Sequence, residues 1–238
     1  MKLKSKTALI TGGSKGIGRS VAEAYVKDGA SVIICARSES ALNSAKDEIS
    51  RFGEVDSIQC DIVNKQDVKN LANIVSQKWG KLDILVNNAS ILGVRSTIID
   101  YPEDVWADVI NVNLNGQFYL TKALLPLLLK SEQPSIINVN SAVGYVGKAT
   151  WGAYSASKFG MEALNQILAD ELQTHNFRVN SVNPGATRTK MRAEAYPDED
   201  PQTLPTPDDI SPVFLYLASD ESQGVTGKVF EARDWIRK

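Results

Sequence analysis

Three residues in the second half of the chain carry side chains that could together move a proton. Ser141 offers a hydroxyl, Tyr154 a phenol and Lys158 an amine. Tyr154 and Lys158 are four residues apart, so on a helix they would lie on one face, one turn apart. An ammonium group beside a phenol favours the ionised form and lowers a pKa that is normally about 10. The pattern predicts a tyrosine that exchanges a proton near neutral pH, although an ordinary amphipathic helix can show the same spacing.

Other groups suited to acid–base or metal chemistry are few. The chain has one histidine, His175, near the end of a predicted helix, and two cysteines, Cys35 and Cys60, in apolar segments. This composition argues against a Ser-His-Asp triad and against a zinc site, so we expect no metal. We expect the two cysteines to be buried free thiols rather than a disulfide.

The composition is that of a soluble globular protein. Of 238 residues, 43% are hydrophobic and 23% are charged, and the net charge is −2. Such a charge does not favour nucleic acid, and no apolar run reaches the roughly 18 residues of a membrane span. The sequence starts without a signal-peptide pattern. We therefore expect a cytoplasmic protein with no nucleic-acid and no membrane partner.

A glycine-rich segment follows the first predicted strand. Residues 6–11 (KTALIT) are apolar, and a helical pattern later runs to Lys27. Between them lie Gly12, Gly16 and Gly18. The start of a helix offers free N–H groups that suit a pyrophosphate, and glycine lets the backbone approach such a ligand. Strand, glycine turn and helix in this order predict a dinucleotide site; the alternative is a glycine turn with no ligand.

The residues after the second predicted strand, 31–36, bear on the choice of cofactor. In dinucleotide folds an acid about 20 residues beyond the glycines binds the adenosine ribose. Here Arg37 and Ser38 stand near that position, and the first acid is Glu39. Together with Lys15 they suit a 2′-phosphate better than a free ribose diol. We expect NADP(H) rather than NAD(H), the alternative being that both cations are merely solvated.

Strands alternate with helices along the whole chain. Further strands are predicted at residues 55–60, 82–86, 135–139, 178–182 and 228–231. Further helices are predicted at residues 39–52, 65–79, 102–130, 153–174 and 208–219. This alternation predicts an α/β fold with one doubly wound parallel sheet, forming a single domain over residues 1–238. The proline-rich stretch 186–207 could be a substrate lid or a plain surface loop.

With these segments in view, the chain resembles the short-chain dehydrogenase/reductase family over residues 6–230. The shared motifs stand in family order and spacing: TGGSKGIG, NNAS, NVNLNG, Ser141, YSASK and NPGATRT. Three longer segments resemble the YciK-like branch of bacterial oxidoreductases: WGAYSASKF, LADEL and NPGATRTKMRAEAYPDEDP. The resemblance implies a single Rossmann-type, doubly wound parallel sheet of about seven strands with helices on both faces.

The resemblance also implies roles for individual residues. Tyr154 would be the general acid or base, Lys158 would lower its pKa and bind the nicotinamide ribose, and Ser141 would hold the substrate oxygen. Asn113, which by itself is only one of three nearby asparagines, would hold a water molecule in a proton relay. The implied catalytic set is Asn113, Ser141, Tyr154 and Lys158, and Ser141 and Tyr154 would also bind the substrate.

The implied cofactor contacts fall in four groups. The glycine segment would hold the pyrophosphate, residues 61–62 would lie near adenine, Asn88 near its ribose, and residues 184–189 on the nicotinamide side. The full predicted set is Gly12, Ser14, Lys15, Gly16, Ile17, Gly18, Arg37, Ser38, Asp61, Ile62, Asn88, Tyr154, Lys158, Pro184, Gly185, Thr187 and Thr189.

These residues predict an NADP(H)-dependent oxidoreductase that interconverts a small carbonyl compound (ketone, aldehyde or 3-oxoacyl) and an alcohol. One alternative is an NAD(H)-linked alcohol dehydrogenase. Another is a protein that senses NADP(H) without turnover, although such a protein has no chemical need for all four catalytic residues. By family analogy we expect a homodimer or homotetramer that uses the helices at 102–130 and 153–174.

Two positions depart from the family pattern. Ser90 stands where the family usually has glycine, and FEARDW (residues 230–235) replaces the usual glycine pair near the C-terminus. The second departure leaves open whether the usual tetramer contacts are made.

Substrate identity stays open. The pocket is expected between residues 90–96, residues 143–151 and the loop after Gly185, with Tyr145 and Trp151 either forming an apolar wall or only packing the loop. Four cations could meet a substrate carboxylate or phosphate, or could point to water: Arg95, Arg188, Lys190 and Arg192.

Overall fold

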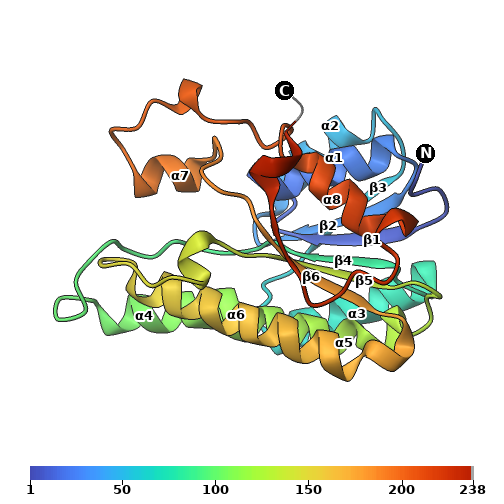
Figure 1. The fold of residues 1–238 in the computed structure, drawn as a ribbon. Helices are drawn as coiled ribbons and strands as arrows, with labels where there is room; N and C mark the ends of the chain where they lie inside the picture. The colour runs from blue at the N-terminus through green and yellow to red at the C-terminus, as the bar shows by residue number, and fades with distance from the viewer. Residues whose placement is uncertain (237–238) are drawn as a thin grey trace.

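Seven strands form one sheet in the computed structural model, which describes residues 1–236 (Figure 1). Their order is β3-β2-β1-β4-β5-β6-β7, and every pairing is parallel. The chain starts in the middle of the sheet and winds first toward β3 and then toward β7, which confirms the predicted doubly wound fold. The strands are β1 (Thr7–Thr11), β2 (Ser31–Ala36), β3 (Val55–Gln59), β4 (Ile84–Asn87), β5 (Ser135–Val139), β6 (Arg178–Asn183) and β7 (Val229–Glu231).

Helices cover both faces of this sheet (Figure 1). One layer contains α1 (Gly16–Lys27), α2 (Glu39–Ile49) and α8 (Ser211–Ala218). The other contains α3 (Lys65–Trp79), α4 (Glu103–Ile110), α5 (Gln117–Leu128) and α6 (Gly152–Glu171). The short α7 (Lys190–Ala195) lies outside both layers.

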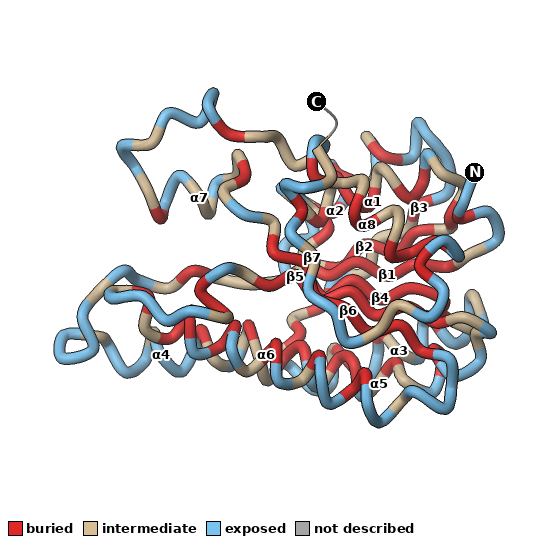
Figure 2. The backbone as a smooth tube through the Cα atoms, viewed as in Figure 1, coloured by how far each residue is buried: buried red, intermediate tan, exposed pale blue. Residues whose placement is uncertain are grey.

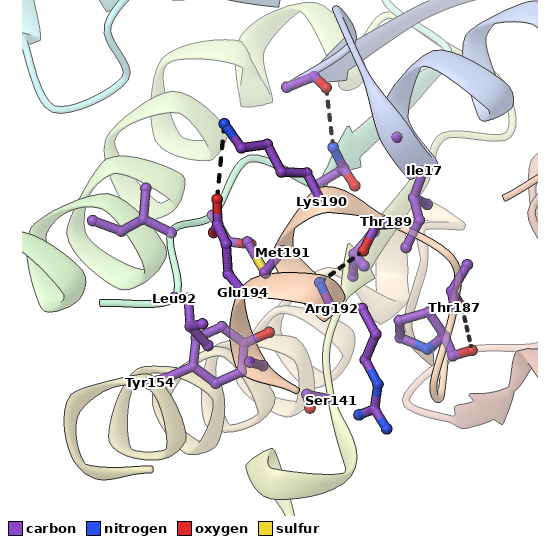
Figure 3. Close-up of a pocket in the computed structure, with 18 of the residues that line it drawn as sticks. Ile17, Leu92, Ser141, Tyr154, Thr187, Thr189, Lys190, Met191, Arg192 and Glu194 are labelled. Atoms are coloured by element: carbon purple, nitrogen blue, oxygen red, sulfur yellow. Dashed lines mark hydrogen bonds and ion pairs between the residues drawn. The ribbon is translucent and has the colours of Figure 1, made fainter. Parts of the chain in front are cut away.

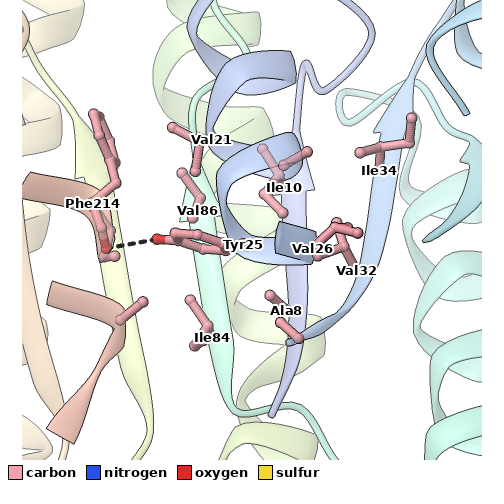
Figure 4. Packing of buried hydrophobic residues seen from close by; sticks show 14 of the residues in the cluster. Ala8, Ile10, Val21, Tyr25, Val26, Val32, Ile34, Ile84, Val86 and Phe214 are labelled. Carbon is pink, nitrogen blue, oxygen red and sulfur yellow. Dashed lines mark hydrogen bonds between the residues drawn. The ribbon is translucent and has the colours of Figure 1, made fainter. Parts of the chain in front are cut away.

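The central strands are buried on both sides, as Figure 2 shows. Ala8 and Ile10 of β1 belong to the core that includes α1 and α8, whereas Leu9 between them belongs to the core that includes α3 and α5. This alternation follows from the two-residue period of a strand, and it explains why the strands are nearly continuous apolar runs. In Figure 4 Tyr25 of α1 reaches across the first core, where its hydroxyl donates to the Phe214 carbonyl at 2.9 Å.

Most differences between predicted and observed elements lie at their ends. The predicted helix at 102–130 is one helical run in which a π-helical turn, Asn111–Gly116, separates α4 from α5, and Pro126 lies inside α5 without ending it. The stretch 186–207 contains α7 and a 3-10 turn, Pro201–Thr203. Cys35 and Cys60 are buried free thiols, as predicted. In the part of the chain that the structure describes, every helix is too short or too polar to cross a membrane.

Candidate active site

A cavity of about 460 Å³ lies at the carboxyl ends of the strands. It is bounded by the loops that follow β1, β4, β5 and β6, and α6 contributes Tyr154 and Lys158. Figure 3 shows Tyr154 and Ser141 at this cavity. Open parallel sheets bind ligands at this edge because successive loops converge there. The predicted site residues that line the cavity are Gly12, Lys15, Gly16, Ile17, Asn88, Ser141, Tyr154, Lys158, Pro184, Gly185, Thr187 and Thr189.

The phenol and the amine are both buried, and burial dominates their proton affinities. Burial raises the pKa of Tyr154 to about 12, although a hydrogen bond with Ser141 acts in the opposite direction and lowers this pKa. Burial lowers the pKa of Lys158 to about 8, and its ammonium donates to the Val139 carbonyl at 2.7 Å. The Lys158 nitrogen lies 5.6 Å from the centroid of the Tyr154 ring. Removal from water therefore dominates the pKa of Tyr154 in this structure, and the expectation that Lys158 lowers this pKa stays a prediction.

Asn113 lies in the π-helical turn and is buried. Its side-chain oxygen accepts from the Ile91 N–H at 2.8 Å, while its amide donates to the Ile91 carbonyl at 2.9 Å and to the Ser157 hydroxyl at 3.1 Å. Asn113 therefore joins α6 to the loop after β4. Ile91 lines the cavity, whereas Asn113 lies behind that wall. The extra residue of a π-helical turn re-aims side chains locally, and such turns are frequent at functional sites.

The glycine segment has the backbone that its sequence predicts. Gly12 and Gly16 have φ angles of +64° and +55°, which favour glycine. A Cβ on Gly18 would lie 2.5 Å from both the Gly12 carbonyl oxygen and the Asn88 amide nitrogen. That amide donates to the Thr11 carbonyl at 2.8 Å, so Asn88 holds the segment against β4. Close packing therefore leaves no room for a side chain at Gly18.

The start of α1 has the character of an anion site. It carries no side-chain cap and no acidic residue in its first turn, and Gly16 and Ile17 line the cavity. Free N–H groups and the helix dipole are therefore available to a negatively charged group. A dinucleotide pyrophosphate fits these residues.

A second hollow adjoins the cavity, and Ile91 lines both. Arg37 and Asp61 line this hollow. Arg37 and Lys15 are exposed, and within residues 1–236 no carboxylate forms a salt bridge with either of them. Two unpaired cations beside the glycine segment are compatible with a 2′-phosphate.

Three predicted contact residues already have roles within the protein. The Ser38 hydroxyl accepts from the Ala41 N–H at 3.4 Å and caps α2, and the Asp61 carboxylate accepts from the Val63 N–H at 3.2 Å. Ile62 is buried in the core beside α3, so its side chain lines neither the cavity nor the second hollow. Ser14 and Gly18 also lie outside both linings. The sequence could not show these internal uses.

Residues 187–195 form one side of the cavity. The Thr189 hydroxyl caps α7 by accepting from the Arg192 N–H at 3.1 Å, and the Thr187 hydroxyl donates to the Pro184 carbonyl at 3.0 Å (Figure 3). Several further lining residues were not singled out from the sequence: Leu92, Met191, Glu194 and Ala195. Only their place within the expected pocket segments hinted at them.

The family model described as short chain dehydrogenase matches residues 6–200. The chain belongs to the short-chain dehydrogenase family. It is 43% identical to the oxidoreductase YciK of Escherichia coli (strain K12), over 97% of this chain and 93% of that protein. It is 37% identical to 3-oxoacyl-[acyl-carrier-protein] reductase FabG of Thermotoga maritima, over 96% of each chain. A short-chain dehydrogenase from Shigella flexneri 2a, strain 301, solved in complex with NADP, is 42% identical and superimposes with a TM-score of 0.95 over 98% of each chain.

One buried group of this short-chain dehydrogenase gave no signal in the sequence. The carboxylate of Glu162 accepts from the Ser181 hydroxyl at 2.6 Å and from the Asn140 amide at 3.1 Å. Asn140 in turn accepts from the Ser141 N–H at 2.9 Å and donates to the Tyr145 hydroxyl at 3.0 Å. Tyr145 therefore belongs to a polar network behind Ser141 and is not a wall of the pocket.

In this dehydrogenase Ser90 lines the cavity and has no positive φ, so serine is accommodated where the family usually has glycine. Within residues 1–236, no group of three or more His, Cys, Asp or Glu side chains is placed to hold a metal ion.

Proposed function

We propose that the protein is an NADP(H)-dependent oxidoreductase that interconverts a carbonyl compound and an alcohol. The observation that carries this proposal is that Ser141, Tyr154 and Lys158 line the same cavity as the uncapped start of α1. The NADP complex of the relative from Shigella flexneri supports the cofactor. The name of the Thermotoga maritima relative supports reduction of a carbonyl group.

The residues that would hold the cofactor follow from the fit described above. The glycine segment and the start of α1 would bind the pyrophosphate, and Arg37, Lys15 and the Ser38 region would bind the 2′-phosphate. Asp61 and Ile62 would flank adenine, and Asn88 its ribose. Residues 184–189 would contact the nicotinamide end. We also propose that residues 186–207, which include α7, act as a lid on the substrate, since α7 forms a wall of the cavity.

The bound nicotinamide supplies or accepts the hydride at the substrate carbon. Ser141 would hold the substrate oxygen by a hydrogen bond, and Tyr154 would donate its proton to that oxygen during reduction or remove it during oxidation. Lys158, whose pKa is about 8, carries a positive charge at neutral pH. That charge would favour the ionised phenol after proton transfer, and Asn113 would hold the wall behind the proton path.

Tyr154→Phe tests the acid–base assignment. The substitution keeps the ring and removes only the hydroxyl, so we expect kcat to fall about 100-fold or more while the melting temperature stays near that of wild type. NADPH oxidation would be followed with ketones, aldehydes and 3-oxoacyl thioesters. Undiminished turnover in the variant would refute the role of Tyr154, and failure of the wild type to oxidise NADPH with any substrate class would refute the proposed function.

Arg37→Ala tests the cofactor. A charge-assisted hydrogen bond contributes about 1.5–3 kcal/mol, so removing it should weaken NADPH binding about 10- to 100-fold. NADH binding should change less than twofold because NADH has no 2′-phosphate. Nucleotide fluorescence titration gives both constants, and Arg51→Ala, which removes an exposed cation elsewhere, is the matched control. Unchanged NADPH binding would defeat the assignment of Arg37 to the 2′-phosphate and favour the NAD(H)-linked alternative.

A further inference from the structure

The wall of the cavity beside Tyr154 is apolar. Leu92, Trp151 and Ala195 are buried in one cluster with Tyr154, and Met191 packs against it. All four also line the cavity, and Figure 3 shows Leu92 beside Tyr154. The Trp151 ring centroid lies 5.6 Å from that of Tyr154. A group attached to the carbon that reacts beside Tyr154 therefore meets aliphatic and aromatic surface.

Arg192, one of the cations that line the cavity, already has an acidic partner. Arg192 donates to Glu199 through Nε at 2.5 Å and through Nη2 at 2.6 Å. Its guanidinium also lies 3.8 Å from the centroid of the Tyr196 ring. Both ends of this pair are partly shielded from water. A bidentate, stacked pair of this kind is stronger than an ordinary surface pair, so a substrate anion would have to replace Glu199 to use Arg192.

Arg95 is held away from the substrate space. Its Nε and Nη2 donate to the Thr150 hydroxyl at 3.0 Å and 2.8 Å, and its Nη1 donates to the Ala195 carbonyl at 3.1 Å. The guanidinium also lies 4.5 Å from the centroid of the Trp151 ring. Thr150 has a φ of +71°, a costly conformation for a β-branched residue, which these hydrogen bonds help to hold. Arg95 thus joins α7 to the loop before α6.

The other two cations are unsuited to an anion beside Tyr154. Arg188 donates to the Pro201 carbonyl at 2.8 Å and to the Leu204 carbonyl at 3.1 Å, so it closes the loop that follows α7. The Lys190 side chain is 79% exposed and lies 3.9 Å from Glu194. The Glu194 carboxylate itself belongs to the cavity lining, where it would repel an anionic group.

Resting on the proposed function, we propose that the substrate is an uncharged carbonyl compound with an apolar group beside the reacting carbon. The site would discriminate against a carboxylate or phosphate close to that carbon. Such an anion would lose its hydration against Leu92, Trp151 and Met191, while the arginines around the cavity keep their internal partners. Lys15 and Lys158, which also line the cavity, are proposed contacts of the cofactor. Reduction would break the π bond of the carbonyl, form one C–H bond with the hydride from NADPH and form one O–H bond with the proton from Tyr154. NADPH would be oxidised to NADP+, and the Tyr154 phenolate would regain a proton from solvent.

Matched neutral and acidic substrates test this proposal on the wild-type enzyme. Two pairs suffice: ethyl acetoacetate with acetoacetate, and ethyl pyruvate with pyruvate. We expect kcat/KM for NADPH-dependent reduction to be at least tenfold higher for the neutral member of a pair. Equal or higher values for the acids would overturn the inference and leave the proposed function standing. No reduction of any of the four compounds by an enzyme that oxidises NADPH with another carbonyl substrate would overturn the inference alone.

Glu199→Gln tests the reason for the discrimination. It releases Arg192 from its carboxylate, so the neutral-to-acid ratio of kcat/KM should fall severalfold. The gain for the acids should vanish in the matched control, the double variant Arg192→Gln, Glu199→Gln. A ratio that is unchanged in Glu199→Gln, with the wild-type melting temperature retained, would overturn the role assigned to the Arg192–Glu199 pair.

Discussion

Burial is the main influence on the pKa values of Tyr154 and Lys158, the side chains proposed to move the proton. It raises the pKa of Tyr154 and lowers that of Lys158, so each group is shifted toward its neutral form. For Lys158 this shift has a cost in stability, because the folded protein must bury a cation at neutral pH. Sites that hold a charge for chemistry commonly lower stability in this way.

Lys158→Met should reveal that cost through its pH dependence. The pKa of Lys158 falls from 10.5 to about 8 on folding, so between these pH values the unfolded chain binds the extra proton. The free energy of unfolding of wild type should therefore rise relative to the variant as pH increases, by about 2 kcal/mol between pH 7.5 and 9.5. Below pH 8 Lys158 is protonated in both the folded and the unfolded chain, so the destabilisation caused by its buried charge reaches its full size.

Urea unfolding at several pH values measures this difference. Lys148→Met, at an exposed position, is the control and should follow wild type. Parallel stability curves for wild type and Lys158→Met would contradict the expectation.

At the scale of elements, two irregular backbone segments build the site. The glycine segment places the uncapped start of α1 at the cavity, and the π-helical turn directs Asn113 toward Ile91. Each depends on close packing against a neighbouring loop. The glycine segment packs on Asn88, and a Cβ on Gly116 of the π-helical turn would lie 2.8 Å from the Ile62 side chain.

Gly18→Ala tests the close packing of the glycine segment. The added Cβ would lie 2.5 Å from the Gly12 carbonyl oxygen, which is backbone and cannot give way without moving the loop. We expect at least a tenfold loss of NADPH affinity and a stability loss of about 1–3 kcal/mol. Gly147→Ala is the matched control, since nothing lies within 4 Å of its Cβ. Nucleotide titration and thermal melting measure both effects, and wild-type NADPH affinity in Gly18→Ala would contradict the packing argument.

For the whole molecule, apolar side chains on α5 and α6 and the C-terminal segment bear on assembly. Phe118, Phe159 and Ile167 are exposed on these two helices.

The C-terminal segment that departs from the family pattern packs on its own chain. Trp235 lies 4.7 Å from the Tyr216 ring, and Arg233 donates to the Ala186 carbonyl at 2.8 Å, at the base of the proposed lid.

We expect the protein to self-associate through α5 and α6, as the sequence predicts. Phe159 is 44% and Ile167 is 50% exposed, so the double variant Phe159→Asp, Ile167→Asp should shift the protein to a smaller species. Phe52→Asp is the matched control, because Phe52 is 48% exposed on a different face. Light scattering coupled to size-exclusion chromatography gives the molar mass. A wild-type monomer would contradict the expectation.

The sequence by itself determined the architecture and pointed to the residues proposed to react. Strands buried on both faces are apolar runs, and a glycine turn before a helix is a local pattern, so both can be recognised from neighbouring residues. The four-residue spacing of Tyr154 and Lys158 placed them on one face of a helix for the same reason.

Tertiary structure decided how these groups behave and what surrounds them. The pKa values of Tyr154 and Lys158 depend on burial by segments distant in sequence, and the polar network of Glu162 depends on contacts across β5 and β6. The sequence left open whether Arg192 meets a substrate or points to water, and only the folded chain shows that Arg192 pairs with Glu199. Desolvation and partner choice are properties of the packed molecule, and no local pattern encodes them.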